Sequence, residues 1–261
     1  MGKMRTPAIF LGHGSPMNAI EQNQWSESWR ALGRELTDVK GVLCISAHWY
    51  TRGCGVTAMT TPRTIHDFGG FPQELFEIVY PAGGDPALAQ HTKSLLAGET
   101  DVVLDESWGL DHGTWSVLVH LFPDANVPVV QLSIDATLDH EKHIEYGRRI
   151  SELRDLGYLI VGSGNIVHNL HESFRHQDAS DGFEWAKSFD TKIKARLADH
   201  DFYSLADYDR IDDNARLSVP TPDHYLPLLY VVGTAAPDEP IDIVCDGFQW
   251  GGISMTGVKV G

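Results

Sequence analysis

The chain has 261 residues with 20 basic and 36 acidic side chains, which gives a formal net charge of -16. A surface this negative repels phosphate backbones and anionic lipids, so neither nucleic acid nor a membrane is an expected partner. A protein of the reducing cytoplasm is expected, because the three cysteines show no C-x-x-C spacing, no signal peptide is visible and no apolar run approaches the ~20 residues of a membrane span.

Strands are predicted where short apolar runs are bounded by glycine, proline or polar residues. In chain order these runs are 6–11, 41–46, 55–59, 101–104, 127–134, 159–161, 241–245 and 253–260. Helices are predicted where apolar residues recur at helical spacing behind capping residues. Those segments are 21–36, 85–97, 115–122, 138–156, 184–198 and 221–232, while 204–216 is expected to be irregular. The alternation indicates one α/β domain over residues 1–261, with a central, mostly parallel sheet and helices on both faces.

A long loop is predicted at 60–72. It contains Ile65-His-Asp-Phe-Gly-Gly-Phe-Pro72, whose glycines and proline disfavour regular structure, while its aromatic residues argue against simple disorder. A loop of this length inside a compact chain is usually functional, and we expect it to act at a binding site or as a lid.

A histidine follows the end of three predicted strands. They are His13, after the strand 6–11, His48, after the strand 41–46, and His168, shortly after the strand 159–161 and a Gly162-Ser163-Gly164-Asn165 turn. In an open α/β sheet the C-terminal strand ends form the edge where ligands bind. Three imidazoles that converge at this edge would form a metal site.

Two further histidines are candidates because of their position. His224 lies near the start of the helix 221–232, where the helix dipole disfavours protonation and leaves an imidazole neutral for a metal. His112 follows Asp111 in a turn, and an adjacent carboxylate can orient it or raise its pKa. We therefore interpret His112 as a proton-transfer group.

Other catalytic signatures do not match. Gly162-Ser163-Gly164 and Gly14-Ser15-Pro16 hold serines behind strands, but neither is the G-x-S-x-G nucleophile elbow. The sequence has no P-loop, and Gly162-Ser163-Gly164 lacks the third glycine of a dinucleotide fingerprint. The residues favour a metal-dependent reaction.

Several separate motifs in this chain resemble those of the class III extradiol ring-cleaving dioxygenases, and most closely their 4,5-DOPA extradiol dioxygenase family. The motifs are Phe10-Leu-Gly-His-Gly-Ser-Pro-Met17, Ser46-Ala-His-Trp49, Ile65-His-Asp-Phe-Gly-Gly-Phe-Pro72, Asp111-His-Gly113, Gly162-Ser-Gly-Asn-Ile-Val-His168 and Pro220-Thr-Pro-Asp-His-Tyr-Leu-Pro-Leu-Leu229. The resemblance implies an α/β fold, one non-haem metal ion, and opening of a catechol ring by O2 beside its two hydroxyl groups.

The resemblance also implies roles for individual residues. His13 and His48 match the first two metal ligands, and His224 occupies a ligand position in this branch. His168 matches an acid/base in the wider superfamily and a ligand in this branch, so both roles remain open. His112 matches a histidine just outside the ligand set. The aromatic candidates to enclose a substrate ring are Trp49, Phe68, Phe71, Trp115 and Tyr225.

The resemblance leaves the metal and the substrate open. Fe(II) is expected for activity, although the carboxylate ligand of the better-known relatives is not obvious here and Asp135 is the only positional candidate. A site dominated by histidine also suits Zn(II). The expected substrates are O2 and a catechol such as L-DOPA, which would be opened to a semialdehyde. The oligomeric state is not readable from the sequence.

Two other functions remain as alternatives. A zinc hydrolase would attack an ester or amide with a metal-bound water, and His112 would move the proton. A relative that kept the pocket only for binding a metal or ligand would catalyse no reaction. Oxygen consumption separates these alternatives from a dioxygenase, because a hydrolase uses none.

Overall fold

A computed structural model describes residues 5–261 of the chain. Its strands are β1 (Ala8–Gly12), β2 (Gly41–Thr51), β3 (Cys54–Thr57), β4 (Val102–Asp105), β5 (Val129–Asp135), β6 (Tyr158–Gly164), β7 (Ile241–Cys245), β8 (Phe248–Gln249), β9 (Ile253–Ser254) and β10 (Gly257–Val260). Eight strands form one sheet in the order β4-β3-β5-β2-β6-β1-β10-β7, and β8 pairs with β9 separately.

The middle of the sheet is parallel. Strands β5, β2, β6 and β1 run in one direction, while antiparallel pairs occur toward the flanks, between β3 and β5, β1 and β10, and β10 and β7. The C-terminal ends of β2, β6 and β1 therefore lie side by side at one edge. Residues that follow these strands are brought together there, as expected for the ligand-binding edge of an α/β sheet.

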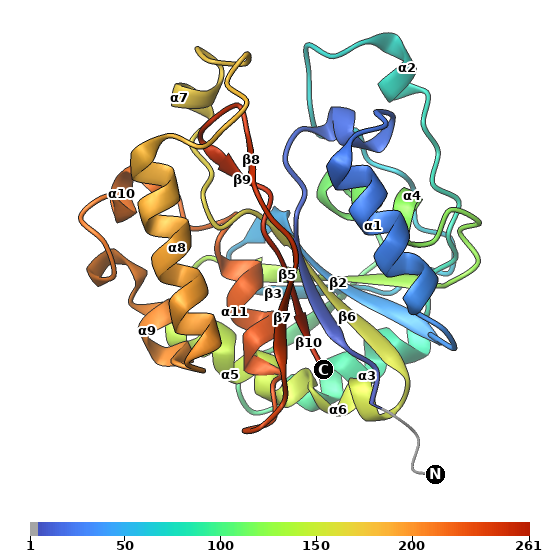
Figure 1. Ribbon diagram of the computed structural model, residues 1–261. Coiled ribbons are helices and arrows are strands. Elements are labelled where there is room, and N and C mark those ends of the chain that lie inside the picture. Colours follow the sequence, from blue (N-terminus) through green and yellow to red (C-terminus); the bar gives the residue numbers. More distant parts are fainter. Residues whose placement is uncertain (1–4) are drawn as a thin grey trace.

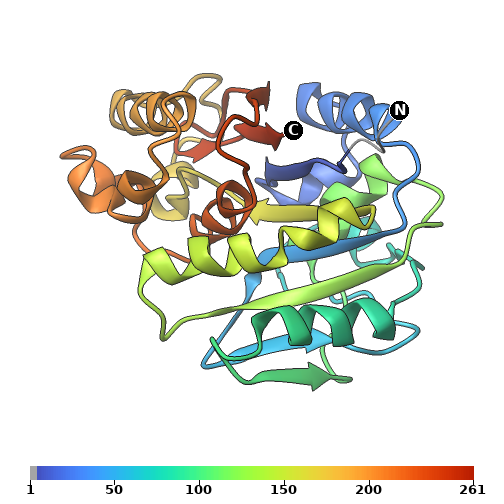
Figure 2. The ribbon, with the colours of Figure 1, turned by 90° about the horizontal axis from the view of Figure 1, so that it is seen from below.

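Helices cover both faces of the sheet, as Figure 1 shows from the side and Figure 2 from below. They are η1 (Pro16–Ala19), α1 (Gln24–Glu35), α2 (Gln73–Phe76), α3 (Pro86–Leu96), α4 (His112–Leu121), α5 (His140–Ile150), α6 (Glu152–Asp155), α7 (Leu170–Ser173), α8 (Glu184–Ala198), α9 (Phe202–Ala206), η2 (Tyr208–Arg210), α10 (Ala215–Ser218) and α11 (Leu226–Gly233). Helices α1 and α4 contribute to one apolar core, whereas α3, α5, α8 and α11 contribute to the other. The α/β architecture predicted from the sequence is confirmed.

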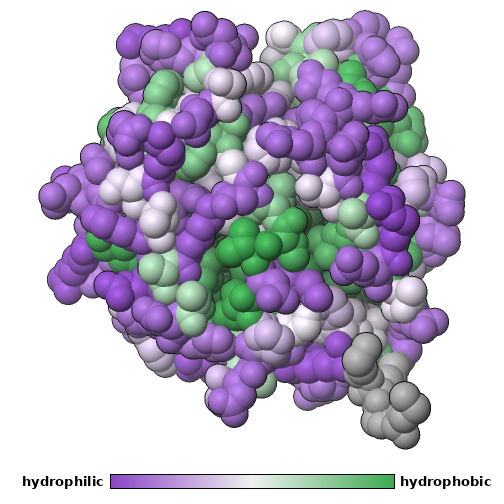
Figure 3. All heavy atoms as spheres, viewed as in Figure 1, coloured by the Kyte–Doolittle hydropathy of each residue, from purple (hydrophilic) through white to green (hydrophobic). Residues whose placement is uncertain are grey.

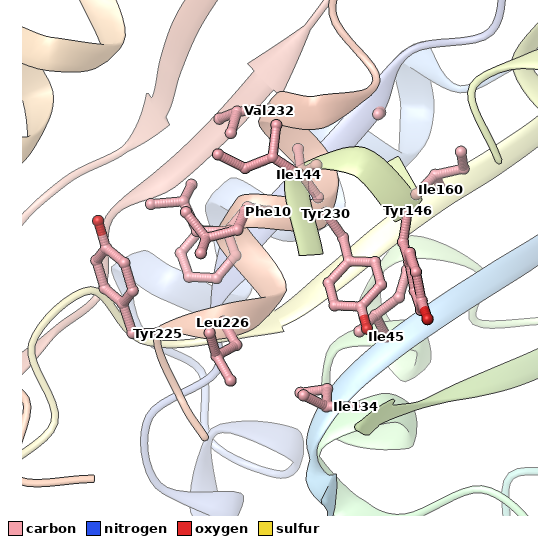
Figure 4. Packing of buried hydrophobic residues seen from close by; sticks show 14 of the residues in the cluster. Phe10, Ile45, Ile134, Ile144, Tyr146, Ile160, Tyr225, Leu226, Tyr230 and Val232 are labelled. Atoms are coloured by element: carbon pink, nitrogen blue, oxygen red, sulfur yellow. The ribbon is translucent and has the colours of Figure 1, made fainter. Parts of the chain in front are cut away.

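Alternate residues of the central strands face the two cores, because side chains in a strand point to opposite faces in turn. Phe10 of β1, Ile45 of β2 and Ile160 of β6 pack on the same side as Tyr230 of α11, as Figure 4 shows. Leu11, the next residue after Phe10, belongs to the opposite core. Each fully buried large apolar side chain contributes about 1.5–3 kcal/mol to the stability of this framework.

Strand β2 is longer than predicted. The expected strand 41–46 continues to Thr51, because its pairing with β5 shifts register after Ile45 and resumes at Tyr50. A shift of this kind bends a strand and changes where its side chains point. His48 consequently lies inside the strand rather than beyond its end.

Two predicted elements are divided. The expected helix 138–156 becomes α5 and α6; near the junction the Ser151 hydroxyl donates to the Arg148 carbonyl at 2.7 Å and competes with the helical bond. The expected strand 253–260 becomes β9 and β10, because β9 pairs with β8 whereas β10 pairs with β1 and β7.

Two other segments also differ from the prediction. The helix expected at 221–232 begins only at Leu226, after a turn in which the Tyr225 N–H donates to the Pro222 carbonyl at 2.9 Å. Residues 204–216, expected to be irregular, contain the end of α9, η2 and the start of α10. His224 therefore lies in a turn just before its helix.

The surface is mostly hydrophilic on the face drawn in Figure 3, in keeping with the net charge of -16. Apolar atoms gather near the centre of this face, over the region of β7 and β10, where Ile243 is 41% exposed. Among the described residues, no helix combines the length and the apolar character that crossing a bilayer requires.

Candidate functional site

Five histidine side chains meet at the C-terminal edge of the parallel strands. The ring centroids of His13, His48 and His224 form a nearly equilateral triangle with sides of 5.0, 5.2 and 5.1 Å. The ring of His112 lies 3.8 Å from that of His48, and the ring of His168 is stacked at 3.5 Å on that of His224. The structure thus brings together every histidine that the sequence singled out for the site.

Two glycines at the end of β6 allow His224 to reach this edge. A Cβ atom on Gly164 would lie 2.1 Å from the carbonyl oxygen of His224, and one on Gly162 would lie 2.7 Å from that of Pro227. With hydrogen atoms in their place, the turn before α11 crosses the strand end, where the Asn165 N–H donates to the His224 carbonyl at 2.8 Å. The Gly-Ser-Gly motif therefore serves close backbone packing.

The His112 ring is delivered by the first residue of α4. The Asp111 carboxylate caps this helix through the Thr114 N–H at 3.1 Å and also accepts hydrogen bonds from Ser46 Oγ and Gln131 Nε2, both at 2.7 Å. Burial raises the pKa of Asp111, and the nearby Asp67 adds to this effect. Asp111 thus fixes the helix start, whereas Asp67 is the carboxylate beside the His112 ring.

The orientation of His13 follows from a single hydroxyl group. Ser163 Oγ has one hydrogen, which it donates to the Gly113 carbonyl at 2.5 Å. At 2.9 Å from His13 Nδ1 the same oxygen must then accept, so the proton of His13 is on Nδ1. The Nε2 atom of His13 is left with a free lone pair.

The other two rings of the triangle are arranged in the same way. The Nδ1 atom of His224 is hydrogen-bonded to Asp223 Oδ2, and the Nδ1 atom of His48 lies 3.3 Å from Asp67 Oδ2. A carboxylate beside Nδ1 favours the proton on that nitrogen and leaves Nε2 unprotonated. All three rings therefore have an oxygen partner at Nδ1, which suits metal binding through Nε2.

The spacing of the ring nitrogens fits a metal ion. His13 Nε2 and His48 Nε2 are 3.2 Å apart, and two unprotonated nitrogens at this distance repel each other unless a cation lies between them. Tetrahedral coordination with metal–nitrogen bonds of about 2.0–2.1 Å separates ligand nitrogens by about 3.3 Å. Ligand atoms of His13, His48 and His112 lie within 4.8 Å of one another, so His112 is a geometrically possible third ligand. His224 is a second candidate through the closeness of its ring, whose centroid lies 5.2 Å from that of His13 and 5.1 Å from that of His48.

Burial keeps three of the histidine rings neutral. The pKa values of His13, His48 and His168 lie well below the ordinary 6.5, mainly because burial disfavours the charged ring and because neighbouring histidines repel a second charge. Burial raises the pKa of Asp67, but its contacts with His112 outweigh this and hold the pKa below its ordinary value. Neutral imidazoles beside an ionised carboxylate are ready to bind a divalent metal.

The carboxylate at this site was not found from the sequence. Asp67 lies in the loop 60–72, where it follows His66 directly, and only the contacts across the fold distinguish it from other loop acids. Asp135, the positional candidate, lies outside the cluster. Its Oδ1 accepts hydrogen bonds from Gly53 N at 3.0 Å and from Thr137 N and Oγ1 at 2.9 and 2.7 Å.

A cavity of about 210 Å³ opens above the histidines. It lies between α7 and the β8–β9 pair on one side and η1 and the loop before α2 on the other, near the notch at the top of Figure 3. Two of the five aromatic candidates line it, Phe68 and Phe71, whereas Trp49, Trp115 and Tyr225 pack elsewhere. Its other lining residues are His13, Gly14, Ser15, Pro16, His48, Asp67, His112, His168, Leu170, Phe174, His224, Trp250 and Ile253.

Comparisons with known proteins agree with this geometry. Residues 7–261 match the family described as the catalytic LigB subunit of aromatic ring-opening dioxygenase. The chain is 49% identical to the 4,5-DOPA dioxygenase extradiol of Escherichia coli (strain K12), covering 100% of this chain and 97% of the relative. It is 35% identical to the protein of the same name from Beta vulgaris, covering 96% and 95%. A crystal structure of an uncharacterized Escherichia coli K12 protein superposes with a TM-score of 0.86 at 44% identity, covering 98% of this chain and 100% of that one. The chain therefore belongs to the LigB family of aromatic ring-opening dioxygenases.

Proposed function

We propose that this extradiol dioxygenase opens the ring of a catechol such as L-DOPA with O2, using one divalent metal ion held by His13, His48 and His224. The observation that carries the proposal is the triangle of three imidazoles, each with an oxygen partner at Nδ1. Relatives that bear the name DOPA dioxygenase support the choice of substrate class. Residues 1–261 act as one catalytic unit.

The working metal in this proposal is Fe(II). Imidazole nitrogens bind both iron and zinc, but iron can exchange electrons, so a bound Fe(II) ion would supply the redox chemistry that lets O2 react with a catechol. Zn(II) fits the same ligands without that chemistry. A purified sample can therefore carry zinc without zinc being the active metal.

His224 is the better third ligand than His112. The His224 ring has an aligned hydrogen bond from Nδ1 to a carboxylate, which fixes the ring and its tautomer. The Nδ1 atom of His112 lies 3.0 Å from Asp67 Oδ1 without the alignment of a hydrogen bond, and it shares this carboxylate with Nδ1 of His48, whereas His224 has Asp223 to itself. A ring held less firmly suits a group that gains and loses a proton.

His168 and His112 manage protons in this proposal. The His168 ring lines the cavity and is stacked on His224 with an angle of 8° between the ring planes, so its nitrogens lie beside the ligand triangle. Burial lowers the pKa of His168, so its ring is neutral at neutral pH and has an unprotonated nitrogen that can accept a catechol hydroxyl proton. His112, on the other side of the triangle, is placed to return a proton to the ring-opened product.

The cavity walls match a flat aromatic substrate. Phe68 and Phe71 line one side, and Phe174 and Trp250 line the other. Their rings offer apolar surface and edge-to-face contacts to a catechol ring while the histidines face its hydroxyl groups. Enclosing the ring in this way orients it and excludes water from the reacting atoms.

The decisive experiment measures oxygen uptake with Fe(II)-loaded protein over a panel of catechols. We expect uptake of one O2 per catechol and a yellow semialdehyde from L-DOPA. A hydrolase would consume no oxygen, and equally rapid cleavage by protein loaded only with zinc would contradict the redox assignment.

Two variants, assayed for oxygen uptake over a range of Fe(II) concentrations, distinguish the third ligand. His224→Ala should lower metal affinity by more than about a hundredfold, whereas His112→Ala should retain the metal and lose turnover. The reverse result would assign His112 as the ligand.

A further inference from the structure

One carboxylate contacts two histidines that come from different elements. Asp67 Oδ2 lies 3.3 Å from Nδ1 of His48 in β2. Asp67 Oδ1 accepts a hydrogen bond from the backbone N–H of His112 at 2.9 Å and lies 3.0 Å from its Nδ1. The carboxylate therefore sits between a proposed metal ligand and a proposed proton-transfer group.

The backbone around Asp67 is held by α4 and the segment before it. The Ile65 N–H donates to the Leu110 carbonyl at 2.7 Å, and Nε1 of Trp115 donates to the Ile65 carbonyl at 2.8 Å. Phe68, the next residue after Asp67, packs edge-on against the His112 ring at 5.4 Å. The same short stretch thus carries the carboxylate and part of the aromatic wall of the cavity.

We propose that Asp67 is a positioning residue that orients His48 and His112 together and so couples metal binding to proton transfer. This inference rests on the function proposed above. A carboxylate at Nδ1 fixes the ring of a metal-binding histidine and strengthens its other nitrogen as a donor. Through its second oxygen, Asp67 holds the start of α4 and keeps the His112 ring beside the same centre. The ring contacts are looser than ideal, as is common for catalytic hydrogen bonds before substrate is bound.

The other partners of the triangle serve one histidine each. Asp223 bonds to the ring of His224, and Ser163 bonds to the ring of His13. Neither contacts a proton-transfer histidine with its side chain among the described residues. The Asp223 charge also acts on the nearby His168 ring. Removing the charge of Asp223 should therefore weaken metal binding with a small effect on turnover, whereas removing that of Asp67 should weaken metal binding and lower turnover strongly.

The test compares Asp67→Asn with Asp223→Asn and with Asp135→Asn as the control outside the site. Zn(II) affinity of the metal-free proteins is measured by calorimetric titration, and kcat is measured at saturating Fe(II) with L-DOPA. We expect both Asp67→Asn and Asp223→Asn to weaken Zn(II) binding by about 10–100-fold. Asp67→Asn should also lower kcat at saturating metal by about tenfold or more, clearly more than Asp223→Asn does, and Asp67→Glu should recover part of both losses.

The outcomes for the Asp67 variants test its positioning role separately from the question of which reaction the protein catalyses. Unchanged Zn(II) affinity and kcat in Asp67→Asn would overturn the positioning role, and so would a loss of kcat of the same size in Asp223→Asn. Thermal unfolding of the metal-free variants identifies any effect of misfolding, which Asp67→Glu would not reverse. If the wild-type protein turned over no catechol, the proposed function would fail, while the Zn(II) titration would still test the role of Asp67 toward His48.

Discussion

Two buried polar clusters lie at opposite ends of the sheet, and they differ in how their hydrogen-bonding groups are used. At the C-terminal end of β1 is the histidine centre described above. At the other end is the Arg154 cluster, formed by Arg154, Glu239 and the carbonyl groups of Thr6, Thr234 and Val260. Both clusters are built from residues distant in sequence.

The Arg154 cluster leaves no donor free. The Nε atom of Arg154 donates to Thr6, and its two terminal nitrogens donate to Thr234, to Val260 and to both carboxylate oxygens of Glu239. All five N–H groups of this fully buried guanidinium are used. In the histidine centre, by contrast, each Nδ1 of the triangle has an oxygen partner, while the Nε2 atoms of His13 and His48 lie 3.2 Å apart and have no oxygen partner among residues 5–261. The Arg154 cluster is closed, in the sense that all of its donors are used, and it joins distant parts of the chain to the sheet. The histidine centre is open, in the sense that it keeps free nitrogen lone pairs, and it can bind a ligand.

The largest predicted effect is a loss of stability when Arg154 is removed from its fully hydrogen-bonded cluster. We expect Arg154→Leu to lower the free energy of unfolding by about 3–5 kcal/mol, because it removes the donor to three backbone carbonyls and the buried partner of Glu239, which keeps the Arg5 side chain and the Ala236 N–H. Urea unfolding measures this loss. Arg149→Leu is the matched control, since the Arg149 side chain is 59% exposed and pairs with Glu99 at the surface, so its removal should cost no more than about 1 kcal/mol. Similar losses in the two variants would show that the cluster is not a special source of stability.

The two clusters should respond to acid in different pH ranges. The pKa values of His13, His48 and His168 are lowered in the folded protein, so below pH 6.5 the unfolded chain binds more protons and stability falls as the pH falls. The pKa of Glu239 is also lowered, because its hydrogen bond with Arg154 outweighs the effect of burial. Its contribution to stability is therefore present above the ordinary pKa of 4.5 and is lost only as the pH falls through the lower folded value.

Urea unfolding of the metal-free protein between pH 4.5 and 7 checks this prediction. Replacing one histidine, as in His13→Gln, should remove one proton from the linkage and flatten the pH slope by about 1.4 kcal/mol per pH unit. If the slope of the variant equals that of the wild type, His13 is not held neutral by the fold.

The smallest predicted effect is a change in substrate preference when one arginine is added beside the cavity, compared with one added beside the Arg154 cluster. None of the residues that line the cavity in the described part of the chain is lysine or arginine. Leu170→Arg, at a 40% exposed lining position, should raise kcat/KM for 3,4-dihydroxybenzoate relative to 4-methylcatechol by about fivefold, the effect of about 1 kcal/mol from one exposed ion pair. Leu156→Arg adds the same charge at a 37% exposed leucine beside the Arg154 cluster and should leave this ratio unchanged. An equal change in both variants would indicate a general effect of net charge.

Much of the fold could be predicted from the sequence, because strands and helices depend on patterns among neighbouring residues. The alternation that assigns Phe10 and Leu11 to opposite cores is of this kind. The extension of β2 through His48 could not be predicted, because it depends on a register shift against β5. The aromatic candidates show the same limit: Phe68 lines the cavity, whereas Trp115 is fully buried in a core.

The sequence alone determined which histidines to consider, since strand ends, glycine turns and a helix start are local features that place a side chain at an edge. Only the tertiary structure decided what stands beside each ring. The partner of His13 Nδ1 is Ser163, and the partner of His48 Nδ1 is Asp67. Such pairings join segments that the chain brings together only on folding. They decide which ring nitrogen carries the proton, and hence which nitrogens are free for a metal.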